Sequence, residues 1–101
     1  MTQIFTSLEE GSVPSEFKLH QNYPNPFNPG TTIRYDLKTA GQVSIRVYDI
    51  TGKEVMTLLN GKRSAGSHIV NFNASGLASG VYILRMTTPG FVQIRKMTLI
   101  K

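Results

Sequence analysis

The chain has 101 residues, enough for one domain but not for two, and its content of 40% apolar and 17% charged residues is typical of a folded protein rather than a disordered one. Because it contains no Cys, disulfides, thiolate nucleophiles and thiolate metal sites are excluded. No stretch is apolar for the roughly 18 residues that a membrane helix needs, and the N-terminus lacks the basic region and apolar run of a signal peptide, so we expect neither.

Charge divides the chain into two parts. Residues 1–16 contain three glutamates and no Lys or Arg, and they include Gly, Ser and Pro without a sustained period, which predicts a flexible acidic linker. Residues 17–101 contain all 11 Lys and Arg residues against three acids. This basic balance favours docking onto an acidic partner or an anionic surface, although outward strand positions are also charged for solubility alone. Without a Lys/Arg-rich run or a nucleic-acid-binding motif, we expect no nucleic-acid partner.

The elements predicted after residue 16 are short strands. A first strand is expected at residues 17–20, and apolar residues then alternate with polar ones at 32–37 and 43–48, the period of a half-buried strand. Four more segments are rich in β-branched and aromatic residues and bounded by turn signals: 54–59, 68–73, 81–87 and 91–100. Seven strands without a helical period predict an all-β fold, an immunoglobulin- or fibronectin-like seven-stranded antiparallel β-sandwich at residues 17–101.

The parity of apolar residues predicts which side chains form the core. In the last strand Val92 and Ile94 share one parity, whereas Met97 and Leu99 share the other. An extra residue near Arg95-Lys96 would place both pairs on one face, so we predict a β-bulge there. The predicted core comprises Ile33, Tyr35, Val43, Ile45, Val47, Val70, Phe72, Leu84, Met97 and Leu99.

Two turns have identifiable chemistry. In Asp49-Ile50-Thr51-Gly52 the carboxylate can bind the backbone two residues on, and Gly52 can adopt the positive φ that closes a hairpin. One acid is far short of a calcium ligand set, so a structural turn is predicted. Gly80 and Tyr82 resemble a tyrosine corner, in which the Tyr hydroxyl binds the preceding loop. Residues 60–66, which begin with Asn-Gly, are predicted to form a loop.

Few residues are candidates for catalysis. His20 and His68 lie far apart in sequence without metal-ligand spacing, and Ser67 and His68 should point to opposite faces of a strand. The three acids of the folded part lie on separate strands or turns. We therefore expect no enzyme activity, no catalytic residue, no metal and no cofactor. A sugar-binding module is a rival interpretation, although Trp is absent and the other aromatic residues mostly occupy core or turn positions.

Residues 21–32 are the most unusual stretch, with three prolines in six residues. Prolines favour extended backbone and exclude both a helix and a central strand. Tyr23 and Phe27 are predicted to anchor the segment to the edge of the sandwich, while the Asn side chains satisfy backbone groups that the prolines cannot.

At these residues the sequence resembles the type A C-terminal sorting domain of the type IX (Por) secretion system of Bacteroidetes. The first motif is Leu19-x-Gln21-Asn22-Tyr23-Pro24-Asn25-Pro26-Phe27-Asn28-Pro29, followed by Ile33-x-Tyr35-x-Leu37. Later matches are Val47-Tyr48-Asp49 with Gly52 and Val55, then Ala65-Gly66-x-His68, Leu77-x-Ser79-Gly80-Val81-Tyr82 and Lys96-Met97-x-Leu99 with Lys101. The middle part also resembles the immunoglobulin-like domain of the flagellar hook-capping protein, a fold-level rival.

The resemblance implies a non-catalytic address label on a secreted protein that passes through the periplasm and reaches the cell surface or the exterior. Its implied partners are an outer-membrane translocon, a sortase-like protease that cuts in the acidic leader, and an upstream cargo domain on the same chain. We expect a monomer; the alternative is an accessory immunoglobulin-like module of an extracellular enzyme, which could bind carbohydrate. The predicted recognition residues are Asn25, Pro26, Phe27, Asn28, Pro29, Lys96, Met97, Leu99 and Lys101, and the predicted structural residues are Asp49, Gly52, Gly80 and Tyr82.

Overall fold

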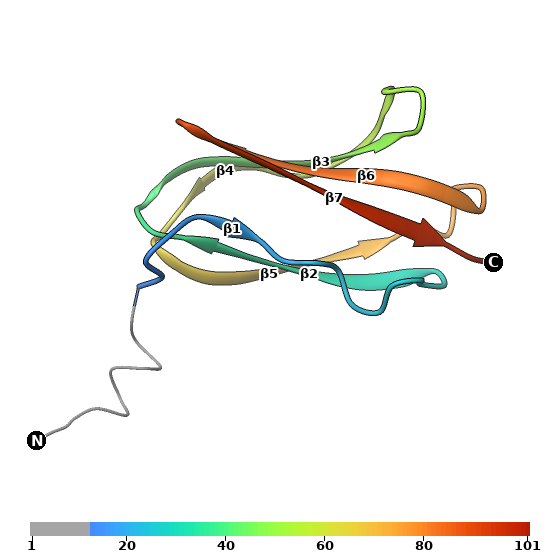
Figure 1. Ribbon diagram of the computed structural model, residues 1–101, viewed down its shortest axis with the longest axis horizontal. Coiled ribbons are helices and arrows are strands. Elements are labelled where there is room, and N and C mark those ends of the chain that lie inside the picture. Colours follow the sequence, from blue (N-terminus) through green and yellow to red (C-terminus); the bar gives the residue numbers. More distant parts are fainter. Residues whose placement is uncertain (1–12) are drawn as a thin grey trace, which may run out of the picture.

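The computed structural model describes residues 13–101, which form seven strands and, within that range, no helix (Figure 1). The first strand is only two residues long, shorter than predicted, and several of the other strands extend beyond their predicted ends. The strands are β1 (Lys18–Leu19), β2 (Gly30–Leu37), β3 (Gly41–Asp49), β4 (Glu54–Arg63), β5 (Gly66–Asn73), β6 (Gly80–Thr88) and β7 (Phe91–Leu99).

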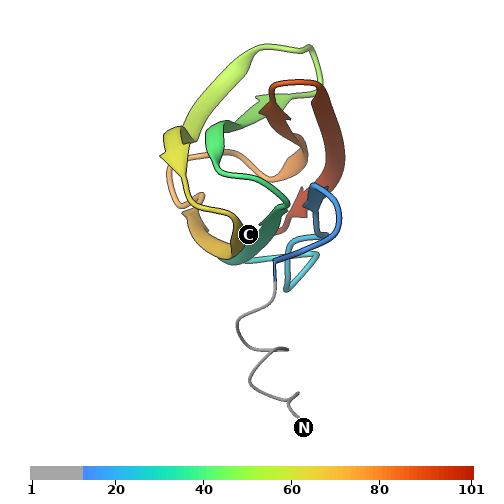
Figure 2. The same cartoon turned by 90° about the vertical axis from the view of Figure 1, so that its left-hand side faces the viewer.

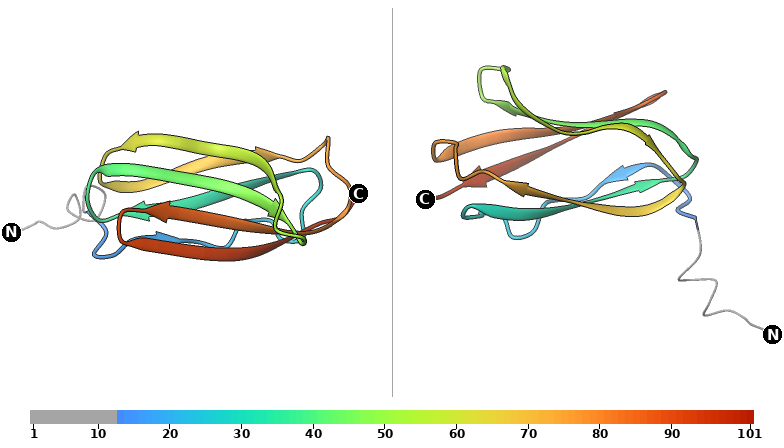
Figure 3. Two further views of the ribbon diagram at one scale, coloured as in Figure 1. Left: turned by 90° about the horizontal axis from the view of Figure 1, so that it is seen from above. Right: turned by 180° about the vertical axis from the view of Figure 1, so that it is seen from behind.

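The strands are arranged in two layers. One sheet has three strands in the order β1-β2-β5, and the other has four in the order β4-β3-β6-β7. Seen from one end the two layers enclose the core (Figure 2), and from above the strands of the larger sheet lie side by side (Figure 3). Neighbouring strands pair antiparallel throughout. The predicted all-β sandwich is confirmed, whereas an immunoglobulin- or fibronectin-like connectivity in particular stays a prediction.

Strand alternation places the predicted core side chains inside. In β2 the residues at 31, 33, 35 and 37 are buried, and those between them are exposed or half-buried. Each predicted core side chain is buried except Val70, which is half-buried against the others. Full burial of such a side chain contributes roughly 1.5–3 kcal/mol. The core also includes Leu19, Phe27, Leu37, Leu59, Ala74, Tyr82 and Met86.

The β-bulge predicted in the last strand is wrong. β7 pairs with β6 in unbroken register from Phe91, opposite Thr88, to Leu99, opposite Gly80. Odd-numbered residues therefore face the core side along the whole strand, and Val92 and Ile94 lie on the outer face, 50% and 55% exposed. The ladder irregularities lie instead between β3 and β4.

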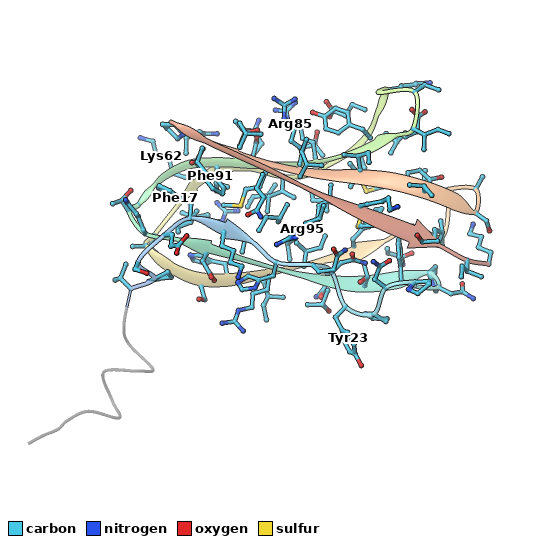
Figure 4. All side chains as sticks on the ribbon, viewed as in Figure 1. Phe17, Tyr23, Lys62, Arg85, Phe91 and Arg95 are labelled. Atoms are coloured by element: carbon cyan, nitrogen blue, oxygen red, sulfur yellow. The ribbon has the colours of Figure 1, made fainter. Side chains whose placement is uncertain are left out.

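Regular pairing of β7 directs two polar side chains, Gln93 and Arg95, toward the other sheet. The Leu19 amide donates to Gln93 Oε1 at 2.7 Å, and Arg95 Nε donates to the Leu19 carbonyl at 2.9 Å. Figure 4 shows Arg95 between the two layers. Both backbone groups of Leu19 therefore have hydrogen-bond partners. The inward side chains of Gln93 and Arg95 bridge the two sheets, so β7 needs no bulge to turn these side chains outward.

The loop predicted at residues 60–66 is mostly strand. Asn60 and Gly61 lie opposite Ser44 and Val43, and β4 continues to Arg63. The Asn-Gly pair is accommodated in the ladder because β3 extends back to Gly41 and supplies a partner strand. Only Ser64 and Ala65 separate β4 from β5.

Two isoleucines in contrasting environments test the core assignment. Ile45 is fully buried, whereas Ile69 is 65% exposed on the outer face of the smaller sheet. We expect Ile45→Ala to lower the free energy of unfolding by about 3 kcal/mol because it removes buried methyl groups and leaves a cavity. Ile69→Ala should cost less than about 1 kcal/mol, the range of strand propensity. Equilibrium urea unfolding measures both, and equal losses would contradict the core assignment.

Candidate recognition site

The Pro-rich segment, residues 21–29, is fixed to the smaller sheet at both ends. The amide of Tyr23 donates to the Thr32 carbonyl, and the amide of Thr32 donates to the Tyr23 carbonyl, each at 3.0 Å. At the other end the Pro29 carbonyl accepts a hydrogen bond of 2.9 Å from the amide of Ala74. The segment is therefore a closed lobe that leaves the sheet after β1 and returns to it at β2.

The lobe is organised around a buried amide side chain, Asn22, which is 2% exposed. Its Nδ2 donates to the Pro24 carbonyl at 3.0 Å and to Thr31 Oγ1 at 3.1 Å, and its Oδ1 accepts from Gln21 Nε2 at 2.7 Å. Thr31 Oγ1 in turn donates to the Pro24 carbonyl at 2.8 Å. A carbonyl before a proline-rich turn has few backbone donors within reach, and Asn22 supplies one.

The lobe also pairs with the last strand. The amide of Phe27 donates to the Thr98 carbonyl, and the amide of Ile100 donates to the Phe27 carbonyl, both at 3.0 Å, which makes a short parallel bridge beside Leu99. Asn25 Oδ1 accepts from the Thr98 amide at 3.0 Å. β7 is an edge strand of its sheet, so these contacts cover outward backbone groups that a partner chain could otherwise pair with.

This contact, which we call the junction, comprises residues 25–29 and 96–101. The Lys96 carbonyl adds to it by accepting from Gln21 Nε2 at 2.8 Å. The structure therefore brings together the two segments in which all the predicted recognition residues lie, although they are far apart in the sequence.

The predicted recognition residues divide by exposure. Phe27, Met97 and Leu99 are buried, and the Phe27 ring packs against Phe72 with centroids 5.8 Å apart. In this fold these three side chains hold the junction together and are not accessible to a partner. The exposed side chains of the set are Asn25, Pro26, Asn28, Pro29, Lys96 and Lys101.

The expectation for the two aromatic anchors is half right. Phe27 is buried as predicted, but Tyr23 is 81% exposed and points away from the sandwich (Figure 4). Its backbone pairing with Thr32 holds the lobe in place, so the ring itself is not needed as an anchor.

The Asp49 turn closes the hairpin between β3 and β4. Asp49 Oδ1 accepts from the Thr51 amide at 2.9 Å, from Thr51 Oγ1 at 2.6 Å and from the Lys53 amide at 3.1 Å, while Gly52 has φ of 91°. These hydrogen bonds, the Thr51 hydroxyl first, hold the pKa of Asp49 below its usual value. The carboxylate is thus occupied by its own turn.

Tyr82 ties β6 to the loop before it. Its hydroxyl donates to the Ala78 carbonyl at 2.6 Å, the contact expected of a tyrosine corner, and Gly80 has φ of 154° at the start of the strand. The same loop holds the end of the chain, because Lys101 Nζ donates to the Ser75 carbonyl at 2.6 Å and the Lys101 amide donates to Ser79 Oγ at 3.0 Å.

Sequence reasoning missed a cluster of His20, Asp36 and Ser67. His20 Nε2 lies 2.7 Å from Asp36 Oδ2, and Ser67 Oγ donates to Asp36 Oδ1 at 2.8 Å. Partial burial acts to raise the pKa of Asp36, but the hydrogen bonds from His20 and Ser67, together with nearby positive charge, outweigh it and lower that pKa. The carboxylate stands between the serine and the imidazole, which is not the order of a nucleophile activated by a base. The pairing of β1 and β5 with β2 brings the three together, and no local motif signals it.

Other kinds of site find little support in residues 13–101. No group of three His, Cys, Asp or Glu side chains in this part is arranged to hold a metal ion. Within the same residues, no helix has the length and apolar character to cross a membrane.

The two sheets and the junction define a small antiparallel β-sandwich module in which a Pro-rich lobe is built onto the edge of the last strand. Residues 21–101 match the family model of the secretion system C-terminal sorting domain, and the chain belongs to this family, the sorting domains of type IX secretion. The chain has no significant match among curated proteins.

Membership implies that the domain interacts with the type IX machinery and is attached to an upstream cargo. It also implies a secreted protein that travels to the cell surface or the extracellular space. Domains of this family are generally not catalytic.

Two asparagines of the lobe test its internal hydrogen bonding. We expect Asn22→Ala to lower the free energy of unfolding by about 1–2 kcal/mol, because the Pro24 carbonyl loses the Asn22 donor and keeps the Thr31 hydroxyl, and the other hydrogen bonds of the buried amide are lost as well. Asn28→Ala, at an exposed position of the same lobe, should change it by no more than about 0.5 kcal/mol. Thermal unfolding by circular dichroism measures both, and equal melting temperatures would contradict the role of Asn22.

The pKa of Asp36 predicts a dependence of stability on pH. Because this pKa is lower in the folded state, ionised Asp36 stabilises the fold above its unfolded pKa of about 3.9, and the contribution is lost as pH falls through the folded pKa. We expect the free energy of unfolding to decrease below about pH 5 in the wild type and to decrease less in Asp36→Asn. Urea unfolding at a series of pH values measures the two slopes, and identical slopes would argue against the cluster.

Proposed function

We propose that the junction is the surface by which the outer-membrane translocon of type IX secretion recognises this domain. The observation that carries the proposal is the hydrogen bonding of residues 25–27 to residues 98–100, because it unites the two ends of the family motif in one place. Exposed Asn and Pro side chains and the two lysines of the junction surround the buried Phe27. They offer a partner hydrogen-bonding groups and positive charge on a rigid base.

Recognition at the junction requires the folded domain. Neither segment alone has the geometry of the pair, since the lobe is held by β2 and by β7 at the same time. A translocon that binds both segments therefore selects cargo whose sorting domain has already folded, after transit through the periplasm.

We further propose that residues 1–16 are the acidic linker in which a sortase-like protease cuts. The sequence of this segment supports the proposal, because it lacks strand alternation and is rich in the small and polar residues that are typical of accessible protease substrates. The residues from Lys18 onward are committed to the sandwich, where backbone pairing protects them from cleavage. Mass spectrometry of the delivered cargo should place its new C-terminus within residues 1–16.

Charge reversal at the junction separates recognition from folding. A reporter fused ahead of residue 1 is expressed in a host with the type IX machinery, with wild-type sequence or with Lys96→Glu and Lys101→Glu. Both lysines are exposed, and the hydrogen bond that the change removes, from Lys101 Nζ to the Ser75 carbonyl, lies at the surface, so we expect the melting temperature to fall by only a few degrees. Delivery of the reporter to the surface should fall by at least about tenfold, since an attraction becomes a repulsion.

A second double variant, Lys38→Glu with Lys62→Glu, is the matched control. It changes the net charge equally, and both lysines are exposed at the end of the sandwich away from the junction (Lys62 in Figure 4). It should deliver the reporter as the wild type does. If the junction variant folds and is delivered at the wild-type rate, the two lysines are only solvated and this assignment is wrong.

A further inference from the structure

The outer face of the larger sheet carries an apolar patch, formed by Tyr48, Ile50, Ile83, Val92 and Ile94. Tyr48 and Ile83 are cross-strand neighbours on β3 and β6, and Val92 and Ile94 follow on β7. Ile50 is 75% exposed, and Val92 and Ile94 are about half exposed. If this outer face contacted only water, we would expect polar side chains at these positions.

The patch includes a hollow of about 270 Å³. It lies where the Asp49 turn meets the sheet, so the hydrogen bonds of Asp49 hold Ile50 in position at its rim. The hollow has the size of a site for one or two side chains. Its lining residues are Tyr48, Asp49, Ile50, Gly52, Ile83, Arg85 and Ile94.

Unpaired positive charge accompanies the patch. Arg85 lies directly opposite Ile94 and points away from the core (Figure 4), and Lys96 lies opposite Ile83. Among residues 13–101 neither has a carboxylate within ion-pair distance, whereas Arg46 on the same face is 3.3 Å from Glu54. The face thus combines an apolar hollow with two cations that lack a partner.

The outer face of the smaller sheet provides a contrast. It has an equivalent cross-strand pair, Arg34 opposite Ile69. There the arginine is 4.0 Å from Asp36, and the neighbouring Thr32 bonds to Asn71. The isoleucine is therefore isolated among polar groups, and the apolar and basic combination belongs to one face only.

We propose that this outer face docks onto an acidic protein surface of the type IX machinery, with an apolar side chain of the partner in the hollow and a carboxylate against Arg85. The proposal rests on the proposed function and adds a second contact to it, which adjoins the junction at Lys96 and is centred on Arg85 and Ile94. Charge complementarity favours this occupant: a second copy of the domain would bring Arg85 and Lys96 against like charges, and a lipid surface has no side chain to fill the hollow.

The test uses matched variants of the reporter fusion. Arg85→Gln with Ile94→Thr removes the charge and the exposed apolar group while keeping a β-branched residue in the strand, and Arg34→Gln with Ile69→Thr makes the same change on the other face. Both should melt near the wild type. Surface delivery should fall by at least about tenfold for the first and remain at the wild-type level for the second.

Several results would overturn the inference. Wild-type delivery of the first variant, with the junction variant still defective, would leave the proposed function intact and remove this docking face. Equal loss for both face variants would show a general surface effect. If light scattering shows a wild-type dimer that the first variant abolishes, the occupant is a second copy. If the wild type binds vesicles containing phosphatidylglycerol and the variant does not, the occupant is a lipid surface. Failure to deliver the wild-type fusion would reject the proposed function itself.

Discussion

The open edge of β7 is the constraint on which the rest of the structure depends. An edge strand presents backbone groups without partners, and a sandwich this small has no spare strand to cover them. In this chain β1 and the segment after it cover that edge: the backbone of Leu19 in β1 bonds to the side chains of Gln93 and Arg95, and Phe27 pairs with the end of β7. Covering the edge with a Pro-rich lobe avoids a further strand that could itself recruit another chain.

This solution explains why buried and exposed residues are mixed in the motif. Phe27 and Leu99 pack inside because the bridge between their backbones draws both side chains toward the core. Asn22 is buried because the lobe needs a donor that its prolines cannot provide. Residues 23–26, which lie between Asn22 and Phe27, are exposed. A short motif therefore combines buried residues that stabilise the fold with exposed residues at its surface.

Local pattern was enough to predict the strands and most of the core, since alternation such as that of Ile33, Tyr35 and Leu37 reports directly on burial. It failed where the environment is set by a distant strand. Gln93 and Arg95 face inward because Leu19 requires hydrogen-bonding partners, which parity alone could not reveal. The meeting of His20, Asp36 and Ser67 depends on the register of three strands, and so does the pairing of the lobe with β7. Polar contacts within a local turn, such as those of Asp49 and Tyr82, were predicted, whereas polar contacts between distant strands were not.

The two segments of the junction lie far apart in the sequence, which determines when the domain can fold during its synthesis. Asn25 and Thr98 are 73 residues apart, and the amide of Leu19 in β1 gains its hydrogen-bond acceptor, Gln93, only when β7 is in place. Contacts of such high sequence separation form late and slow folding, because the intervening chain must be ordered first. A nascent chain that stops short of residue 98 cannot close the lobe, whatever the length of its cargo. Only a chain that has been synthesised through residue 100 can therefore assemble the junction.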